Sequence, residues 1–356
     1  MTGHTGFKGT WLTLWLLSLG AKVVGYSLPC VKKSFYKSHF EALALHKKIV
    51  HIEGDIRDFS RLKESLLEHQ PEIVFHLAAQ PIVLHAFSDP KETFDVNSFG
   101  TTNLLEAIRL CPSVKAAVLI TTDKCYENKE WLWGYRENDR LGGSDPYSAS
   151  KAMTELAARS YRDSFFKNGP FIATARAGNV IGGGDFSPFR IIADTMKAMM
   201  EQKPVAVRNP KSVRPWIHVL EPLYGYLLLG EKLQSEGEAF AQSWNFGPKD
   251  PYGITVEALV AKTIELWGEG SWIDASELSP NKEMGLLRLN WDKAAHLLGW
   301  EPVTEWTGAI EKTTTWFKNY QHLVKNSEKM FSFSTNCIQE FQNALSTDSI
   351  RGILSH

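Results

Sequence analysis

The chain contains little cysteine, and the cysteines it has are scattered. They are Cys30, Cys111, Cys125 and Cys337, and no two of them form a C-x-x-C pair. Zinc sites and redox-active dithiols need closely spaced ligands, and disulfide scaffolds need a far higher cysteine content. The sequence therefore predicts a reduced, cytoplasmic protein without a metal site.

An excess of charge of either sign is also absent. Lysine plus arginine number 39 and aspartate plus glutamate number 40, so the formal net charge is −1. Binding to nucleic acid or to an anionic membrane surface favours a marked basic excess, so neither partner is expected. With 43% hydrophobic and 22% charged residues, the composition is that of a globular protein with a sizeable core. Any anionic small molecule would have to be bound by a few placed cations.

Long apolar runs are missing as well. No segment reaches the ~20 consecutive apolar residues of a membrane span. The stretch from Trp11 to Leu19 follows Lys8 and resembles the core of a signal peptide. It runs into Gly20-Ala-Lys-Val-Val, which reads as a turn and a strand, and no small-residue cleavage site is evident. We therefore interpret the stretch as a buried helix.

A glycine-rich turn lies at the amino terminus. The sequence Gly3-His-Thr-Gly6-Phe-Lys-Gly9 leads directly into an apolar helix predicted over 10–19. Such turns bring backbone N–H groups close to a pyrophosphate at a helix N-terminus, where the helix dipole favours negative charge. The spacing departs by one residue from G-x-G-x-x-G, so the signal is weak on its own. The candidate cofactor contacts in the turn are Gly3, Thr5, Gly6, Phe7 and Gly9.

The strand that should precede this turn is absent from the sequence. A dinucleotide-binding unit reads strand, glycine turn, helix, strand, but only Met1 and Thr2 come before Gly3. That strand occupies the middle of a doubly wound sheet. Without it we expect two unpaired central edges and poor cofactor affinity, as in a chain whose record begins late.

Strand and helix patterns alternate over the first half of the chain. Helices are predicted at 99–110 and 147–166, and they separate apolar segments typical of strands. These segments are 22–27, 49–53, 72–76, 116–121 and 170–177. Such βαβ alternation predicts an α/β fold with a doubly wound, Rossmann-like parallel sheet and helices on both faces.

The pattern becomes less regular after residue 178, where glycine and proline become more frequent. We predict a dinucleotide-binding domain over 1–178 and a smaller substrate-binding lobe over 179–330, interleaved with returning core elements. The tail, 331–356, contains a short amphipathic pattern that includes Ile338 and Phe341. We expect this tail to pack on the surface.

Two strand ends offer further cofactor contacts. Asp55 and Ile56 follow the strand at 49–53, and Asp55 is placed to accept hydrogen bonds from an adenine amino group. Asp55 or Asp58 can equally be the N-cap of the next helix, and the two roles are compatible. The strand at 72–76 is followed by mostly small residues that let a cofactor pass close. They are Leu77, Ala78, Ala79 and Gln80.

The segment from Thr121 to Lys151 carries candidate catalytic groups at both ends. Tyr147 and Lys151 are four residues apart in a run of helix formers, so they share one helix face. A nearby ammonium favours the phenolate and makes the phenol a base at neutral pH. The same spacing occurs by chance in many helices, and the glycine turn is what gives it weight.

Together, the glycine turn and the Tyr-x-x-x-Lys pair resemble the extended short-chain dehydrogenase/reductase family, which binds nicotinamide cofactors and acts on nucleotide sugars. Further motifs resemble the CDP-glucose 4,6-dehydratases within it, and this resemblance covers most of the chain. The motifs are GHTGFKG-x-W-L, Thr122-Asp-Lys-Cys-Tyr126, Asn128-Lys-Glu-Trp-x-Trp-Gly-Tyr-Arg-Glu-Asn138, Asp145-Pro-Tyr-Ser, Arg176-Ala-Gly-Asn-Val-Ile-Gly-Gly-Gly-Asp185 and Arg214-Pro-Trp-x-His-Val-Leu-Glu-Pro222.

The resemblance implies conversion of CDP-D-glucose to CDP-4-keto-6-deoxy-D-glucose, in deoxysugar and lipopolysaccharide biosynthesis. Hydride leaves C4 for NAD⁺, water is lost across C5 and C6, and the hydride returns to C6. Tyr147 would remove the proton of the 4-hydroxyl, and Thr122 would hydrogen-bond the same oxygen. Lys151 would lower the tyrosine pKa and hold the nicotinamide ribose.

The Asp-Lys pair at 123–124 would carry the elimination. Asp123 would protonate the leaving C6 hydroxyl, which requires a pKa raised by burial. Lys124 would remove the C5 proton, which requires that burial or nearby cations disfavour its charged form. In related thymidine-nucleotide dehydratases a glutamate occupies the lysine position, so Asp-Lys indicates the cytidine branch. The alternative is a loop ion pair without a catalytic role.

Substrate contacts and assembly follow from the same resemblance. Asn179 and Arg214 resemble family contacts to the sugar pyrophosphate, and Arg208 is a second candidate, because arginine suits bidentate phosphate recognition. Each of them could instead be a structural ion-pair partner. The family also implies a homodimer through a four-helix bundle, formed here by helices 99–110 and 147–166.

The cofactor and the activity keep alternatives open. NAD-specific sites usually carry an acid after the second strand, but here Gly25-Tyr-Ser27 is followed by Lys32 and Lys33, which would tolerate a 2′-phosphate. NAD is still the expectation, because the cycle returns its own hydride. The competing activities are a nucleotide-sugar 4-epimerase, which needs Tyr147 and Lys151 but no Asp-Lys pair, and a truncated, non-catalytic nucleotide binder.

Overall fold

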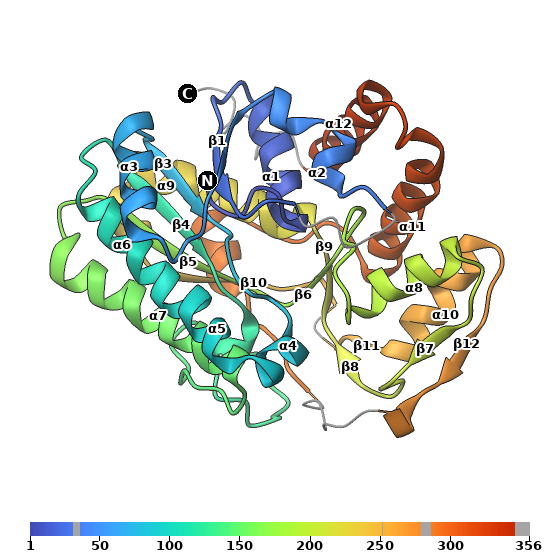
Figure 1. Ribbon diagram of the computed structural model, residues 1–356. Helices are drawn as coiled ribbons and strands as arrows, with labels where there is room; N and C mark the ends of the chain where they lie inside the picture. Colours follow the sequence, from blue (N-terminus) through green and yellow to red (C-terminus); the bar gives the residue numbers. More distant parts are fainter. Residues whose placement is uncertain (31–35, 251, 279–285, 346–356) are drawn as a thin grey trace.

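The computed structural model describes residues 1–30, 36–250, 252–278 and 286–345 (Figure 1). Its main sheet is parallel throughout, and each strand predicted up to residue 177 is confirmed. The strands form two parallel groups that Thr2 bridges. One group is β2 (Val50–Glu53) and β1 (Val24–Ser27), and the other, in order, is β3 (Ile73–His76), β4 (Ala116–Ile120), β5 (Phe171–Ala177) and β10 (Ser243–Phe246).

Met1 and Thr2 lie between β1 and β3, where the sequence predicts a gap. Thr2 forms parallel bridges with Tyr26 of β1 and His76 of β3. Its N–H donates to the Phe75 carbonyl at 2.9 Å, and its own carbonyl accepts a main-chain N–H from the end of β3 at 3.1 Å. The expectation of two unpaired central edges is corrected at Thr2, which pairs with both neighbours, but β1 and β3 do not pair with each other, and they belong to separate groups of strands.

Helices cover both faces of the sheet, and the side chains of β4 show why. Ala116, Val118 and Ile120 pack into the core on one face, and Ala117 and Leu119 pack into the core on the other. The first face is covered by α1 (Phe7–Ser18) and α9 (Leu220–Ser235), and the second by α3 (Phe59–His69), α6 (Gly100–Arg109) and α7 (Pro146–Phe165).

Two helix starts are decided by local chemistry. The Asp145 carboxylate caps α7 by accepting from Ser148 N–H at 2.9 Å, and Pro146 occupies the first turn. Helix α1 begins at Phe7, before the predicted start at residue 10, because extended Gly6 is its N-cap. The glycine turn and the helix are thus continuous.

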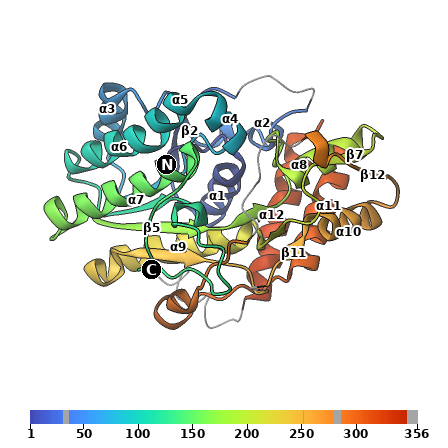
Figure 2. The ribbon, with the colours of Figure 1, turned by 90° about the horizontal axis from the view of Figure 1, so that it is seen from below.

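Residues after β5 form short strand pairs and helices beside the main sheet. Both views show β7, β12, α8 and α10 together, on the far side of the molecule from α3 and α6 (Figures 1 and 2). The chain returns to the main sheet through α9 and β10, and the domain boundary at 178/179 stays a prediction. The elements of this lobe are β6 (Asn179–Ile181) paired with β9 (Trp216–His218), β7 (Val205–Val207) paired with β12 (Trp272–Asp274), β8 (Val213–Arg214) paired with β11 (Ile254–Thr255), and the helices α8 (Ile191–Met200), α10 (Val256–Trp267) and α11 (Trp306–Leu323).

The remaining helices complete the two faces. Helix α12 (Ser327–Ala344) packs on α1, where the Phe341 ring lies 5.7 Å from that of Trp15. Ile338 and Phe341 are fully buried there, so this part of the tail belongs to the core and does not pack on the surface as expected. The short helices are α2 (His39–Ala42), α4 (Val83–Ser88) and α5 (Pro90–Phe94).

Among the described residues, neither a candidate membrane span nor a candidate metal site is found. Within the described part of the chain, every helix is too short or too polar to span a lipid bilayer. The same residues contain no group of three or more His, Cys, Asp or Glu side chains that could hold a metal ion.

Candidate active site

One cavity of about 300 Å³ lies at the carboxyl ends of β4 and β5, where they meet the lobe. Open α/β sheets bind ligands at this position. All five predicted catalytic residues and all three predicted substrate contacts line it. The charged residues among those described in its wall are mostly cations, as an anionic substrate requires: Lys8, Lys124, Lys151, Arg190, Arg208 and Arg214, against Asp123 and Asp185.

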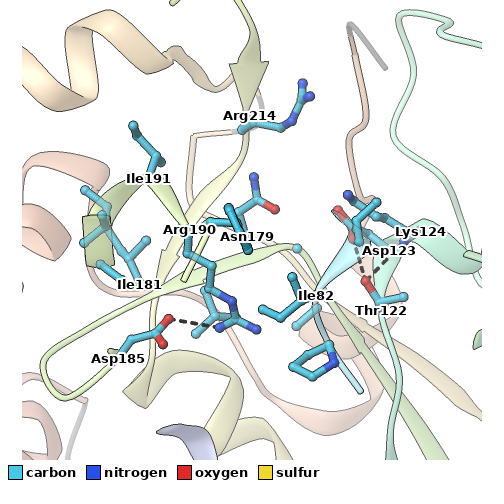
Figure 3. A pocket seen from close by; sticks show the side chains of 18 of the residues that line it. Ile82, Thr122, Asp123, Lys124, Asn179, Ile181, Asp185, Arg190, Ile191 and Arg214 are labelled. Atoms are coloured by element: carbon cyan, nitrogen blue, oxygen red, sulfur yellow. Dashed lines mark hydrogen bonds and ion pairs between the residues drawn. The ribbon is translucent and has the colours of Figure 1, made fainter. Parts of the chain in front are cut away.

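The turn after β4 places Thr122, Asp123 and Lys124 on one wall of this cavity (Figure 3). A short 3-10 turn, Asp123–Cys125, follows the strand, and the Thr122 hydroxyl caps it by accepting from Lys124 N–H at 3.3 Å. The same hydroxyl donates to Asp123 Oδ1 at 2.9 Å. The side chains of Asp123 and Lys124 therefore lie side by side and face the same space.

Asp123 has the electrostatics that a carboxylic acid donor needs. Burial raises the pKa of its carboxyl, and the neighbouring Lys124, the Thr122 hydroxyl and Arg214 oppose that shift only in part. The direction agrees with the sequence-based requirement for a neutral acid. Lys124 itself is half-buried.

Tyr147 corrects one expectation. Burial raises the pKa of its phenol to about 12, and the Thr122 hydroxyl and Arg190 pull it down only partly. The sequence predicts the opposite direction, because it assumes that the Lys151 ammonium stabilises the phenolate. Instead, Lys151 Nζ donates to the Ile120 carbonyl at 3.3 Å. Desolvation outweighs the cation in this arrangement.

Lys151 is buried beside the same strand end. Burial lowers the pKa of its ammonium to about 8, and the carboxylate of Glu155, one helical turn further along α7, opposes the shift. The ammonium is thus close to titration near neutral pH. Tyr147 and Lys151 both line the cavity from α7, as their spacing predicts.

Sequence reasoning missed two cations in the cavity. Lys8 lies in the glycine turn between two predicted contacts, and burial, with Arg190 and Lys151, lowers its pKa to about 7. Arg190 precedes α8 and pairs with Asp185 at 2.9 Å on the side of the cavity away from Asp123 (Figure 3). For Lys8, the sequence feature that could have indicated the cavity is a charged side chain at the start of a mostly apolar helix.

The glycine turn has the close approaches that explain its glycines. Gly3 has φ +71°, and a Cβ there would lie 2.6 Å from Ala78 N. A Cβ on Gly9 would lie 2.1 Å from the Gly3 carbonyl oxygen. Thr5 Oγ1 is bonded to Ser27 Oγ at 2.7 Å, which ties the turn to the end of β1. The remaining predicted contacts here are Gly6, the N-cap, and Phe7, the first residue of α1.

The predicted cofactor contacts after β3 differ in where they lie. Leu77 and Ala79 line the cavity, whereas Ala78 packs against the glycine turn. Gln80 is instead structural: its amide donates to Thr93 at 2.8 Å, and its main-chain N–H donates to Asn97 at 2.8 Å. A buried amide needs such partners, so Gln80 supports the strand end.

Asp55 is engaged by its own loop. Its carboxylate accepts from Arg57 Nη2 at 2.6 Å and from Arg57 N–H at 2.9 Å, and this arginine lowers the pKa of the carboxyl. Asp58 is the N-cap of α3, accepting from Arg61 N–H at 3.1 Å. Ile56 is buried against Gly100. Lys32 and Lys33, which the sequence suggests would tolerate the 2′-phosphate of NADP, lie outside the described residues.

Three predicted substrate contacts come from the lobe side. Asn179 opens β6, Arg214 ends β8 and Arg208 follows β7. Arg208 Cζ lies 5.5 Å from the ring centre of Phe189, which also lines the cavity. Phe189 is more than half exposed and has φ +63°, a conformation that bulky residues rarely adopt.

Comparison with known sequences finds relatives over nearly the whole chain. A family model described as GDP-mannose 4,6 dehydratase matches residues 1–313. The chain is 46% identical over 327 residues to CDP-glucose 4,6-dehydratase of Salmonella typhimurium, covering 89% of each protein. It is 25% identical to dTDP-D-glucose 4,6-dehydratase of Bos taurus, covering 92% of this chain and 91% of the relative.

Solved structures show the same fold. The dTDP-glucose 4,6-dehydratase of Bacillus anthracis in complex with NAD matches with a TM-score of 0.73 at 20% identity, covering 92% of this chain and 98% of that one. An epimerase of Methanothermobacter thermautotrophicus matches with a TM-score of 0.76 at 23% identity, covering 92% and 93%. The Rossmann-like architecture predicted from the sequence is thereby confirmed. With the family model spanning most of its length, the chain belongs to the GDP-mannose 4,6 dehydratase family of extended short-chain dehydrogenases/reductases, as its motifs indicate.

Proposed function

We propose that the protein is a CDP-glucose 4,6-dehydratase that uses NAD and makes a 4-keto-6-deoxy sugar nucleotide for deoxysugar and lipopolysaccharide biosynthesis. The observation that carries this proposal is the convergence of Asp123, Lys124, Tyr147 and Lys151 on one cavity. The 46% identity to a CDP-glucose 4,6-dehydratase supports the choice of substrate.

The residues around the glycine turn fit a dinucleotide. Gly3 and Gly9 leave no room for a Cβ, and no side chain caps the start of α1, so the N–H groups of its first turn can meet a pyrophosphate. When bound, NAD accepts the hydride and returns it. Lys151 and Tyr147 lie where α7 faces the cavity, and Leu77 and Ala79 give the ring an apolar wall.

Tyr147, Asp123 and Lys124 would each transfer one proton. To take the proton of the sugar 4-hydroxyl, Tyr147 would act as its phenolate, which the positive charges of NAD⁺ and Lys151 would favour against the effect of burial; Thr122 bonds the same oxygen. Asp123, kept neutral by burial, donates its proton to the departing C6 hydroxyl. Lys124 takes the C5 proton, from its place beside Asp123. The cations Arg190, Arg208 and Arg214, together with Asn179, hold the pyrophosphate and the rest of the nucleotide.

The test is a comparison of nucleotide sugars. The purified protein with NAD should convert CDP-glucose to a 4-keto product, seen as an absorbance that appears on adding alkali, faster than it converts UDP-, dTDP- or GDP-glucose. Formation of CDP-galactose without a keto product would indicate the 4-epimerase instead. Binding of CDP-glucose and NAD without any turnover would indicate the non-catalytic alternative.

We also propose a homodimer in the cytoplasm. Apolar side chains are exposed at Phe99, just before α6, and at Met153, Leu156 and Phe165 on the neighbouring α7, which suits a four-helix bundle between two copies. Replacing Leu156 by arginine should convert a dimer to a monomer in sedimentation velocity. A wild-type protein that sediments as a monomer would overturn the assembly. The free cysteines suit a reducing compartment.

A further inference from the structure

A buried ion pair lies directly behind the wall that carries Asp123 and Lys124. Arg176 Nη2 of β5 contacts Glu155 Oε2 of α7 at 2.7 Å, and the two side chains are 2% and 1% exposed. Removing two charges from water is costly unless further hydrogen bonds compensate. Glu155 receives them from Thr121 Oγ1 at 2.5 Å and Thr174 Oγ1 at 2.7 Å.

This pair is connected to both ends of the segment 121–126. Thr121, which donates to Glu155, is the residue before Thr122. Tyr126 closes the segment, and its hydroxyl accepts from Arg176 Nη1 at 2.7 Å and donates to Asn245 Oδ1 at 2.7 Å. The three residues proposed to act on the sugar thus lie between two anchors on one ion pair.

The same ion pair is fixed to the helix that carries the oxidation chemistry. Glu155 lies on α7 four residues after Lys151 and eight after Tyr147. The pair therefore links two sets of groups that must meet one sugar ring: Tyr147 and Lys151 of α7 at C4, and Asp123 and Lys124 of the turn after β4 at C6 and C5.

We infer that Glu155, Arg176 and Tyr126 are positioning residues, which set the Asp123–Lys124 turn against α7 so that elimination keeps pace with oxidation. The inference rests on the proposed function. None of the three lines the cavity. A displacement of about 1 Å at a reacting group can cost ~10²-fold in rate. Loosening the turn should slow elimination more than oxidation, because Tyr147 and Lys151 stay on their helix.

The test compares two buried tyrosines. Tyr126→Phe removes the hydroxyl that joins Arg176 to Asn245. Tyr135→Phe is the matched control: the Tyr135 ring stacks on Tyr126 at 5.1 Å, and within the described part of the chain its hydroxyl accepts from Lys129 N–H at 2.6 Å and donates to Asn128 Oδ1 at 3.1 Å, both in the neighbouring loop. Both side chains are buried, and each substitution removes one buried hydroxyl while keeping the ring.

For Tyr126→Phe we expect kcat for dehydration to fall by about 10-fold or more, with KM for CDP-glucose little changed and reduced cofactor accumulating during turnover. Tyr135→Phe should show neither effect at a similar loss of melting temperature. Thr121→Val, which loosens the other anchor, should repeat the Tyr126→Phe pattern.

Hydrogen exchange supplies a readout that needs neither cofactor nor turnover. The amides of 122–125 should exchange faster in Tyr126→Phe and Thr121→Val than in Tyr135→Phe. The inference would be overturned if all three variants showed the same amide exchange in 122–125 and the same accumulation of reduced cofactor. If the wild type fails to dehydrate CDP-glucose, the proposed function fails, whereas the exchange comparison still decides whether the ion pair holds the turn.

Discussion

The two walls of the cavity are built differently. Thr122, Asp123, Tyr147 and Lys151 are buried and come from the end of a central strand and the helix beside it. The facing wall takes its cations from short segments of the lobe, at β8 (Val213–Arg214) and just after β7 (Val205–Val207). The side chains of the first wall are held by the parallel sheet and by α7. The positions of the cations in the second wall depend on strand pairs of only two and three residues.

This difference assigns separate tasks to the walls. Buried side chains with altered proton affinity suit chemistry, because their electrostatics are fixed by burial. Half-buried cations on short strands suit recognition, because they can adjust to a phosphate and a base. Substitutions in the first wall should therefore lower kcat, and substitutions in the second should raise KM.

The largest expected effect comes from Lys124→Ala. Removing the proposed C5 base should lower turnover by about 10²- to 10⁴-fold while oxidation continues, so enzyme-bound reduced cofactor should accumulate with CDP-glucose. Its absorbance in stopped flow measures this. Lys129→Ala is a suitable control, because Lys129 pairs with Glu127 outside the cavity. Full turnover by Lys124→Ala would refute the assignment.

Asp123→Asn should separate activity from stability. We expect a loss of about 10²-fold or more in kcat, because asparagine cannot donate the proton. Burial raises the pKa of Asp123, so the wild type loses stability as pH rises through that raised pKa, and the neutral amide does not. The melting temperature of the variant should gain on that of the wild type as pH rises from the ordinary carboxyl pKa to the raised one, and the difference should level off above it. A constant difference across pH would contradict the burial argument.

Arg214→Ala should act on the second wall. A hydrogen bond to a charged partner contributes about 1.5–3 kcal/mol, so KM for CDP-glucose should rise about 10- to 100-fold with kcat little changed. Arg140→Ala, at an exposed arginine outside the cavity, is the control. A fall in kcat alone would place Arg214 with the catalytic wall.

The smallest effect is expected from Phe189→Leu. The exposed ring beside Arg208 is suited to stacking on a nucleobase, an interaction of about 1–3 kcal/mol per base. Leucine keeps the apolar contact and loses the stacking, so affinity for CDP should fall by about 3- to 10-fold in calorimetry. Unchanged affinity would place the base elsewhere.

For the first wall, the sequence predicted which side chains lie there but not the direction of every pKa shift. The strand and helix periodicities located β4 and α7, and the Asp-Lys and Tyr-x-x-x-Lys motifs located the side chains on them. The direction of the Tyr147 shift was wrong, because a four-residue spacing says nothing about burial or about the Ile120 carbonyl that holds Lys151.

The lobe and the strand ends show the limits of local patterns. Local pattern does not mark Lys8, which stands among the glycines of the turn, or Arg190, whose partner Asp185 lies within an irregular segment. Gln80 follows a strand like a cofactor contact but is fixed by Thr93 and Asn97. Such roles depend on tertiary partners that no spacing encodes.

The most direct test of the central claim follows one atom. CDP-glucose deuterated at C4 should yield a 4-keto-6-deoxy product with deuterium at C6. When it is mixed with undeuterated CDP-glucose that carries carbon-13, no deuterium should appear in the carbon-13 product. Deuterium lost to solvent, absent from C6, or found at C4 of CDP-galactose would contradict the account.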